Sequence, residues 1–400
     1  MRGSSGPRCG AALGELGLIQ DGSLLIRDGE LVEVGPTRRV ENLAEARKAV
    51  EINAAGRVVM PGFVDSHTHL AFPPPGGSGF DAEAAAREIR ATNGQRLERR
   101  ARGYLQAMAR HGTTTVEVKT GCGPDEKAET KILRVLSALK RDPVDVIPTF
   151  LFRLPPPTNG NGGAPETGWA FRELMPKIRR RSLARFADVA WERESDRLGC
   201  LVRYLGVARE LGFPCKVHAD QPGAGAAIQA AVEHLALTID HLEYATASEA
   251  RLLAGSSTMA TLLPCASFQS GGADAPARAL IDAGVALALA SNFNPLLTPT
   301  LNMQTVVALA CLRMGMTAAE AISAATINGA HAVGRAGRTG SLEPGKLADL
   351  LILDASDYRE LARRFGTNLV RMTMKRGEII YKEGAVGGSH ADSTPLHERG

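Results

Sequence analysis

The stretch GFVDSHT, residues 62–68, is a short apolar run that ends in polar residues, and seven similar runs follow it. These are TTTVEVKT (113–120), VDVIPTFLF (144–152), RFADVAW (185–191), PCKVHAD (214–220), LTIDHLE (237–243), TMATLLP (258–264) and VALALASN (285–292). Segments with helical periodicity, such as GQRLERRARGYLQAMARHG, separate the runs. Eight strand-then-helix units over about 275 residues predict an α/β fold, a closed TIM-type (β/α)8 barrel, for which roughly 250 residues is typical. An open doubly wound sheet is the alternative, but it usually has fewer strands.

Both ends of the chain have a different, β-rich pattern. The stretch GSLLIRDGELVEVG (22–35) alternates apolar residues on both sides of Asp28-Gly29, a two-residue turn signal that predicts a hairpin. Further strand-like stretches are AVEINAAGRVVMPG (49–62), GSLEPGKLADLLILD (340–354) and RMTMKRGEIIY (371–381). We therefore expect residues 1–60 and 340–385 to form one small β-sandwich domain, residues 61–339 the barrel, and the polar segment 386–400 a disordered tail.

The composition limits the class of protein. A chain of 400 residues that is 44% hydrophobic suits one large domain with a smaller one. The net charge of +4 and the 4% aromatic content argue against a nucleic-acid-binding or scaffold protein, and the basic clusters at 96–102 and 177–185 are typical of solvated helix faces. Six cysteines without a CxxC pair, together with no segment resembling a signal peptide or membrane span, predict a cytoplasmic protein without membrane partners.

Histidines recur at the carboxyl ends of the predicted strands, where a barrel of this kind carries its active site. His67 and His69 end the first run, and because strand side chains alternate, both imidazoles can face one ion. His218 ends the fifth run and His241 the sixth. We predict one divalent ion, zinc or iron, on His67, His69 and His218; the alternative is that they are buried core histidines. Other polar residues on or at the ends of these runs are Glu117, Lys119 and Asn292.

Several motifs carry a family resemblance. The stretch VMPGFVDSHTHL (59–70) resembles the first-strand signature of the metal-dependent amidohydrolases, and the split β-rich ends resemble their small β-sandwich domain. More narrowly, HGTTTVEVKTGCG, PVDVIPTFL, KVHAD, DHLEY, FNP and AATINGAHAVG resemble the imidazolonepropionase family, from Gly10 to Tyr381. The resemblance implies an enzyme of histidine degradation that hydrolyses a cyclic amide C–N bond, opening 4-imidazolone-5-propanoate to N-formimino-L-glutamate. It also implies a small-molecule substrate and a possible homodimer.

The same resemblance implies roles for individual residues. His67, His69, His218 and Asn292 would be the metal ligands, and His241 would contact the metal-bound water or the substrate. Gln221 would occupy a catalytic position, and Arg153, Cys122 and Asn294 would face the substrate.

The chain departs from the family pattern at positions close to this chemistry. The eighth strand ends in aspartate in the family but in Asn292 here, and a neutral amide cannot act as a base. Gln221 replaces a glutamate, Cys122 a tyrosine and Leu154 a histidine, and the arginine expected in segment 72–80 is missing.

Two interpretations follow from these departures. In the first, the protein is still a hydrolase, with an altered substrate and with His241 as its obvious proton-transfer group. Arg153 would then receive an anionic group of the substrate, unless it simply faces solvent. In the second, the protein is a degenerate relative that binds a metal or a ligand without hydrolysis, because function depends on the site rather than on the fold.

Overall fold

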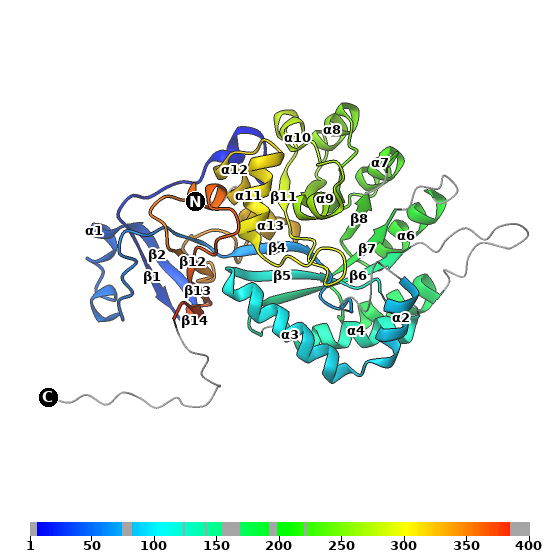
Figure 1. The fold of residues 1–400 in the computed structure, drawn as a ribbon, viewed down its shortest axis with the longest axis horizontal. Coiled ribbons are helices and arrows are strands. Elements are labelled where there is room, and N and C mark those ends of the chain that lie inside the picture. Colours follow the sequence, from blue (N-terminus) through cyan, green and yellow to red (C-terminus); the bar gives the residue numbers. More distant parts are fainter. Residues whose placement is uncertain are drawn as a thin grey trace, which may run out of the picture.

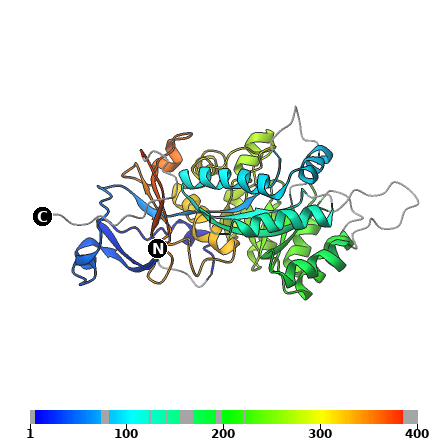
Figure 2. The ribbon, with the colours of Figure 1, turned by 90° about the horizontal axis from the view of Figure 1, so that it is seen from below.

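The computed structural model describes residues 6–73, 82–122, 125–140, 142–153, 169–191, 198–219 and 222–384. An elongated molecule contains a barrel at one end and a smaller group of strands from both chain ends at the other (Figures 1 and 2). Gln221, Leu154 and the segment 386–400 lie outside the described residues, as does most of the segment 72–80.

All eight predicted barrel strands are present and run parallel in one sheet, in the order in which they occur along the chain. They are β4 (Phe63–Thr68), β5 (Thr113–Lys119), β6 (Asp145–Arg153), β7 (Phe186–Ala190), β8 (Cys215–Ala219), β9 (Thr238–His241), β10 (Met259–Leu262) and β11 (Leu287–Leu289). The sheet closes where the chain after β11 meets the end of β4: the Asn292 N–H donates to the His67 carbonyl oxygen at 3.1 Å, and the His69 N–H donates to the Phe293 carbonyl oxygen at 2.7 Å. A closed barrel, rather than an open sheet, is therefore the fold.

Helices between the strands cover the outside of the barrel (Figure 1). They are α2 (Ala82–Ala91), α3 (Gly94–Arg110), α4 (Glu126–Ala138), the π-helical turn Trp169–Leu174, α5 (Met175–Arg180), α6 (Leu198–Glu210), α7 (Gly225–Glu233), α8 (Ala247–Ala254), α9 (Pro264–Ser270), α10 (Ala277–Ala283), α11 (Met303–Arg313), α12 (Ala318–Ala325) and α13 (Ile327–Ala332). In α3, Leu97, Ala101, Leu105 and Met108 recur every three to four residues and are buried, as expected for a helix that packs one face on a sheet. The Asn93 side chain caps this helix by accepting from the Arg96 N–H at 2.9 Å.

The smaller part of the molecule is built from both chain ends. It contains the predicted hairpin of β1 (Gly22–Arg27) and β2 (Glu30–Pro36), and a four-stranded antiparallel sheet. That sheet has the order β14 (Glu378–Lys382), β13 (Val370–Lys375), β12 (Leu350–Leu353) and β3 (Val59–Pro61). The short helices here are α1 (Thr37–Val40), the 3-10 turn Ala46–Lys48 and α14 (Glu360–Arg363). Leu24 and Ile26 of the hairpin pack on the buried Ile352 and Met372 of the sheet, so the two layers share a small core.

The first described residues contact the barrel. The Asn328 side chain of α13 donates to the Arg8 carbonyl oxygen at 2.8 Å and to the Leu287 carbonyl oxygen at 2.7 Å. Leu13, in the 3-10 turn Gly10–Gly14, is fully buried in the main core. Arg8 and Leu13 thus contact the barrel, although the sequence places residues 1–60 in the small domain. The domain boundaries at residues 60 and 340 stay a prediction.

A buried ion cluster joins the small sheet to the barrel. Lys375 of β13 is 2.7 Å from Asp349 and 2.9 Å from Asp145, the first residue of β6. Arg376 also pairs with Asp145. The Lys375 side chain is only 3% exposed, so its charge depends on these carboxylates for compensation. This cluster attaches the sheet to the amino-terminal end of the barrel strands, the end opposite the predicted site.

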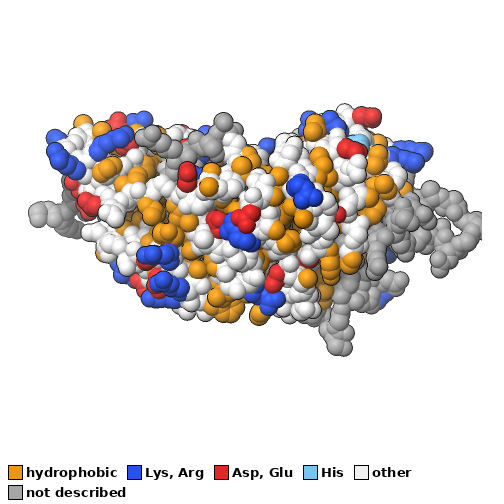
Figure 3. Space-filling model, turned by 90° about the horizontal axis from the view of Figure 1, so that it is seen from above, with side chains coloured by type: hydrophobic (Ala, Val, Ile, Leu, Met, Phe, Trp, Pro, Cys, Tyr) orange, Lys and Arg blue, Asp and Glu red, His pale blue; other side chains and the backbone are white. Residues whose placement is uncertain are grey.

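On the face shown in Figure 3, basic and acidic side chains are interspersed with hydrophobic and uncharged ones, and they do not gather into one basic area there. In the described part of the chain, every helix is too short or too polar to cross a membrane.

Candidate metal and active site

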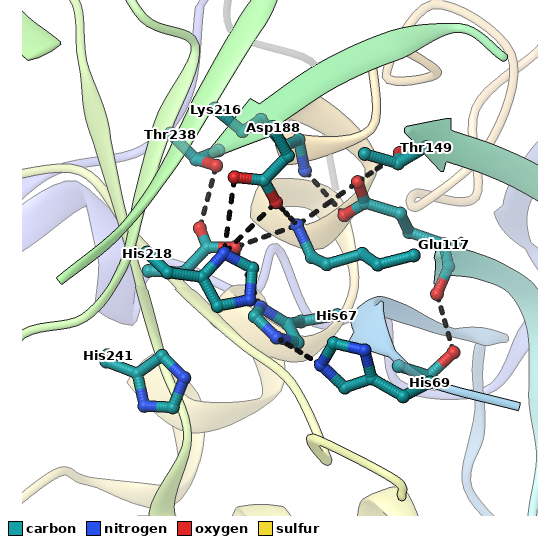
Figure 4. A network of polar contacts seen from close by, with 12 residues as sticks. His67, His69, Glu117, Thr149, Asp188, Lys216, His218, Thr238 and His241 are labelled. Atoms are coloured by element: carbon teal, nitrogen blue, oxygen red, sulfur yellow. Dashed lines mark hydrogen bonds and ion pairs between the residues drawn. The ribbon is translucent and has the colours of Figure 1, made fainter. Parts of the chain in front are cut away.

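Four buried histidines converge at the carboxyl ends of β4, β8 and β9 (Figure 4). His67 lies on β4 and His69 directly after it, and their Nε2 atoms are 3.3 Å apart. The ring centres of His67 and His218 are 4.5 Å apart, and His241 is 5.6 Å from each of them. None of the four is more than 8% exposed. The structure thus brings together all the histidines that the sequence singled out.

Carboxylates behind two of these histidines set the direction of their rings. The His67 Nδ1 atom is 2.7 Å from Asp240, and the His218 Nδ1 atom is 3.2 Å from Asp188. With Nδ1–H donated to a carboxylate, Nε2 keeps its lone pair and points away from the carboxylate, which is the usual arrangement behind a metal ligand. The His218 Nε2 atom is buried without a hydrogen-bond partner among the described residues, so it is a candidate donor to an ion.

The protonation state of His67 and His69 also fits a metal. Burial, followed by the nearby charge of Lys119, lowers the pKa of His67 well below its ordinary value of 6.5. Burial, followed by electrostatic repulsion from the neighbouring His218 and Arg153, does the same to the pKa of His69. Neutral imidazole is the form that binds a metal. The side chains present therefore fit a zinc- or iron-class ion.

A second histidine group could also hold an ion. Ring nitrogens of His67, His218 and His241 lie within 4.8 Å of one another, and the Nε2 atom of His69 is 3.3 Å from that of His67. His241 is thus a possible ligand as well as a proton-transfer group, and the ligand set of His67, His69 and His218 stays a prediction. Asn292, three residues after β11, is half-buried and has a left-handed backbone with φ of 53°.

His241 has its own carboxylate partner and an unusual backbone. Its Nδ1 atom is 3.1 Å from Glu243, which is nearly buried. His241 and Leu242 have φ angles of 84° and 67°, a region that non-glycine residues rarely adopt. Strained backbone of this kind is tolerated where the surroundings require it, and it concentrates at functional sites.

A fully buried ion network underlies the histidines (Figure 4). Lys119 contacts Asp188 at 2.6 Å, Asp240 at 3.0 Å and Glu117 at 3.4 Å. Lys216 contacts Glu117 at 2.6 Å. Burial alone would raise the pKa of Asp240, but the Lys119 ammonium, the hydrogen bond with His67 and the charge of Lys216 together hold that pKa well below its ordinary value, so the side chain accepts as a carboxylate.

Sequence reasoning missed the roles of Asp188 and Asp240. A signal was present, because each is a carboxylate in the middle of a predicted strand, flanked on both sides by apolar residues in RFADVAW and on one side in LTIDHLE. A charge in such a position must be paired when the strand is buried on both sides.

The predicted substrate-facing residues have different surroundings. Arg153 ends β6 and is exposed; its Nε–H donates to the Gly121 carbonyl oxygen at 3.1 Å, and its charge reaches His69. Cys122 is buried, and burial raises the pKa of its thiol, so a neutral thiol lines this position. Asn294 is buried and uses its side-chain oxygen to accept from the Leu296 N–H at 3.0 Å, which stabilises the turn after β11. Gln221 lies outside the described residues.

Comparison with known proteins places the chain in a family. It belongs to the amidohydrolase family, whose profile matches residues 58–380. Within that family the chain belongs with the imidazolonepropionases. It is 38% identical to the imidazolonepropionase of Chloroflexus aggregans, over 94% of this chain and 95% of the relative. It is 36% identical to the imidazolonepropionase of Geobacillus kaustophilus, over 96% of this chain and 95% of the relative. Among solved structures, the 5-methylcytosine deaminase of Klebsiella pneumoniae aligns with a TM-score of 0.71 at 19% identity, over 92% of this chain and 96% of that one, a likeness of fold.

Proposed function

We propose that this protein is a metal-dependent hydrolase of a cyclic amide C–N bond of the imidazolonepropionase type, which opens 4-imidazolone-5-propanoate to N-formimino-L-glutamate. One observation carries the proposal: buried histidine nitrogens converge at the carboxyl ends of the barrel strands, and three of the histidines are backed by carboxylates. The full-length similarity to imidazolonepropionases supports the choice of substrate.

The metal site in this proposal consists of His67, His69 and His218, with the neutral amide of Asn292 as a weak fourth ligand. Zinc and iron are the ions that best suit imidazole donors of this kind. When bound, the ion would lower the pKa of a water molecule and polarise the ring carbonyl of the substrate.

Protein side chains would supply the remaining functions. Glu243 orients His241, so that its Nε2 atom can take a proton from the attacking water and return it to the ring nitrogen that leaves. Arg153, exposed at the end of β6, would bind the propanoate carboxylate. Gln221, at a catalytic position of the family, cannot exchange a proton, so His241 would carry this role alone.

Turnover of 4-imidazolone-5-propanoate by the metal-loaded protein tests the proposal. We expect ring opening that a chelator abolishes and added zinc or iron restores. His218→Ala should remove the activity, whereas His234→Ala, at the end of α7 and outside the site, should retain it. A folded, metal-loaded protein without turnover would contradict the proposal.

A second candidate function rests on Asn292. Because this residue brings no charge to the ion and no base to the reaction, a protein that binds a metal or a ligand without hydrolysis is the alternative. Stoichiometric metal together with absence of turnover at high substrate concentration would favour it.

The cellular setting is part of the same proposal. All six cysteines are free thiols, which supports a reducing compartment such as the cytoplasm. A homodimer, and the absence of nucleic-acid and membrane partners, stay predictions.

A further inference from the structure

Five ionisable side chains lie fully buried beneath the histidines and connect four barrel strands, β5, β7, β8 and β9. They are Glu117, Lys119, Asp188, Lys216 and Asp240. The two ammonium groups in this network have unequal surroundings. Lys119 contacts three carboxylates at 2.6 to 3.4 Å. Among the described residues, Lys216 pairs with one carboxylate, Glu117, at 2.6 Å, and lies 4.9 Å above the Phe186 ring.

The two closest partners of Lys119 each hold a different histidine. Asp188 Oδ2 is 2.6 Å from the ammonium, and the same carboxylate lies 3.2 Å from His218 Nδ1. Asp240 Oδ2 is 3.0 Å from the ammonium and 2.7 Å from His67 Nδ1. One atom, Lys119 Nζ, therefore lies between the carboxylates that orient two candidate metal ligands from separate strands.

The two carboxylates are close enough to need this cation. Oxygen atoms of Asp188 and Asp240 lie within 4.8 Å of each other and have no contact with solvent. Like charges at this distance in a buried site repel strongly, and an opposite charge placed between them offsets the repulsion. Without Lys119 the carboxylates would separate, and each would draw its histidine ring with it.

We propose that Lys119 is a positioning residue that directs His67 and His218 toward one ion by bridging Asp188 and Asp240. This inference rests on the metal site of the proposed function. It goes beyond that function by assigning the relative placement of two ligands to a side chain that touches neither the ion nor the substrate. Lys216 pairs with Glu117 rather than with either aspartate, so it is the matched comparison within the same network.

Cobalt(II) titration of the metal-free protein tests this role, because the visible absorption of cobalt reports the geometry of its ligands independently of turnover. We expect wild-type protein to bind one cobalt ion. Lys119→Met should bind it about 10- to 100-fold more weakly, the range seen when partners of metal ligands are removed, and should shift the absorption bands. Lys216→Met, the matched control, should leave the bands unchanged and the affinity within about threefold of wild type.

A second comparison covers the case in which Lys119→Met fails to fold. The double variant Lys119→Met/Asp188→Asn, which removes one charge of each sign, is compared with the single variant Asp188→Asn. We expect the cobalt bands of the double variant to differ from those of Asp188→Asn, because Asp240, which orients His67, has lost its contact with the cation. Identical bands in this pair, or an equal loss in Lys216→Met and Lys119→Met, would overturn the inference. Wild-type protein that binds no cobalt would instead overturn the metal site itself, and the inference with it.

Discussion

Replacing Lys375 with methionine should detach the small sheet from the barrel, because this side chain neutralises two carboxylates in a buried interface. Its ammonium lies 2.7 Å from Asp349 and 2.9 Å from Asp145, and the three side chains are 3%, 1% and 17% exposed. Removing one partner of a buried ion pair costs about 3–5 kcal/mol.

The lower end of that range applies here, because the carboxylates keep other partners. Asp145 retains Arg376, and Asp349 still accepts from the Thr339 hydroxyl at 2.8 Å and from the Arg376 N–H at 3.0 Å. We therefore expect Lys375→Met to lower the free energy of unfolding by about 3 kcal/mol, a change of more than about 100-fold in the folding equilibrium.

Urea denaturation followed by circular dichroism measures this loss. Arg371→Met is the matched control, because Arg371 is on the same strand but 49% exposed, with carboxylates at 3.5 and 4.0 Å. An exposed pair of this kind contributes about 0–1 kcal/mol. Equal losses in the two variants would refute the reasoning that burial makes the Lys375 cluster a major contact between sheet and barrel.

Three further predictions concern the site and the pH dependence. Asp240→Asn should weaken zinc binding roughly 10- to 100-fold, because it removes the carboxylate behind His67. Isothermal titration with a competing chelator measures the zinc affinity, and an affinity equal to that of wild type would contradict the prediction. Asn292→Asp with Gln221→Glu should raise ring-opening activity, because a positioned acid–base group contributes roughly 10²–10⁴-fold in rate; a folded, metal-loaded double variant without gain would favour the non-catalytic alternative. Although burial opposes it, the charge of Lys375 lowers the pKa of Asp145 below its ordinary 3.8. The contribution of Asp145 to stability is therefore present above pH 3.8 and disappears as the pH falls through the lower pKa of the folded state. Between pH 7 and 3, the free energy of unfolding should fall less steeply at the acid end in Lys375→Met than in wild type.

The barrel could be predicted from sequence because its strands are marked locally. Eight short apolar runs separated by amphipathic helices leave few ways to arrange them, and the structure confirms every run as a strand. The hairpin at Asp28-Gly29 was also predictable, because its turn residues adopt the positive φ angles, 52° and 79°, that this dipeptide favours. The placement of residues 8–16 on the barrel was not predictable, because it depends on contacts between residues far apart in the sequence, such as that of Arg8 with Asn328, 320 positions away.

The histidines of the site were predictable for the same local reason, since each ends a strand. Their partners were not, because Asp188, Asp240 and Lys119 come from three strands and meet only when the barrel closes. Periodicity shows that these residues are buried but gives no pairing between strands. The resemblance to a family predicted a set of ligands and left the carboxylates behind them unassigned.

X-ray absorption of the zinc-loaded protein would show whether the converging histidines bind an ion. We expect one zinc ion per chain with imidazole nitrogens from His67, His69 and His218 at about 2.0–2.1 Å and without sulfur ligands. The same measurement on His67→Ala/His218→Ala should find no bound ion. Wild-type protein that retains no zinc, or a zinc ion without imidazole ligands, would contradict it.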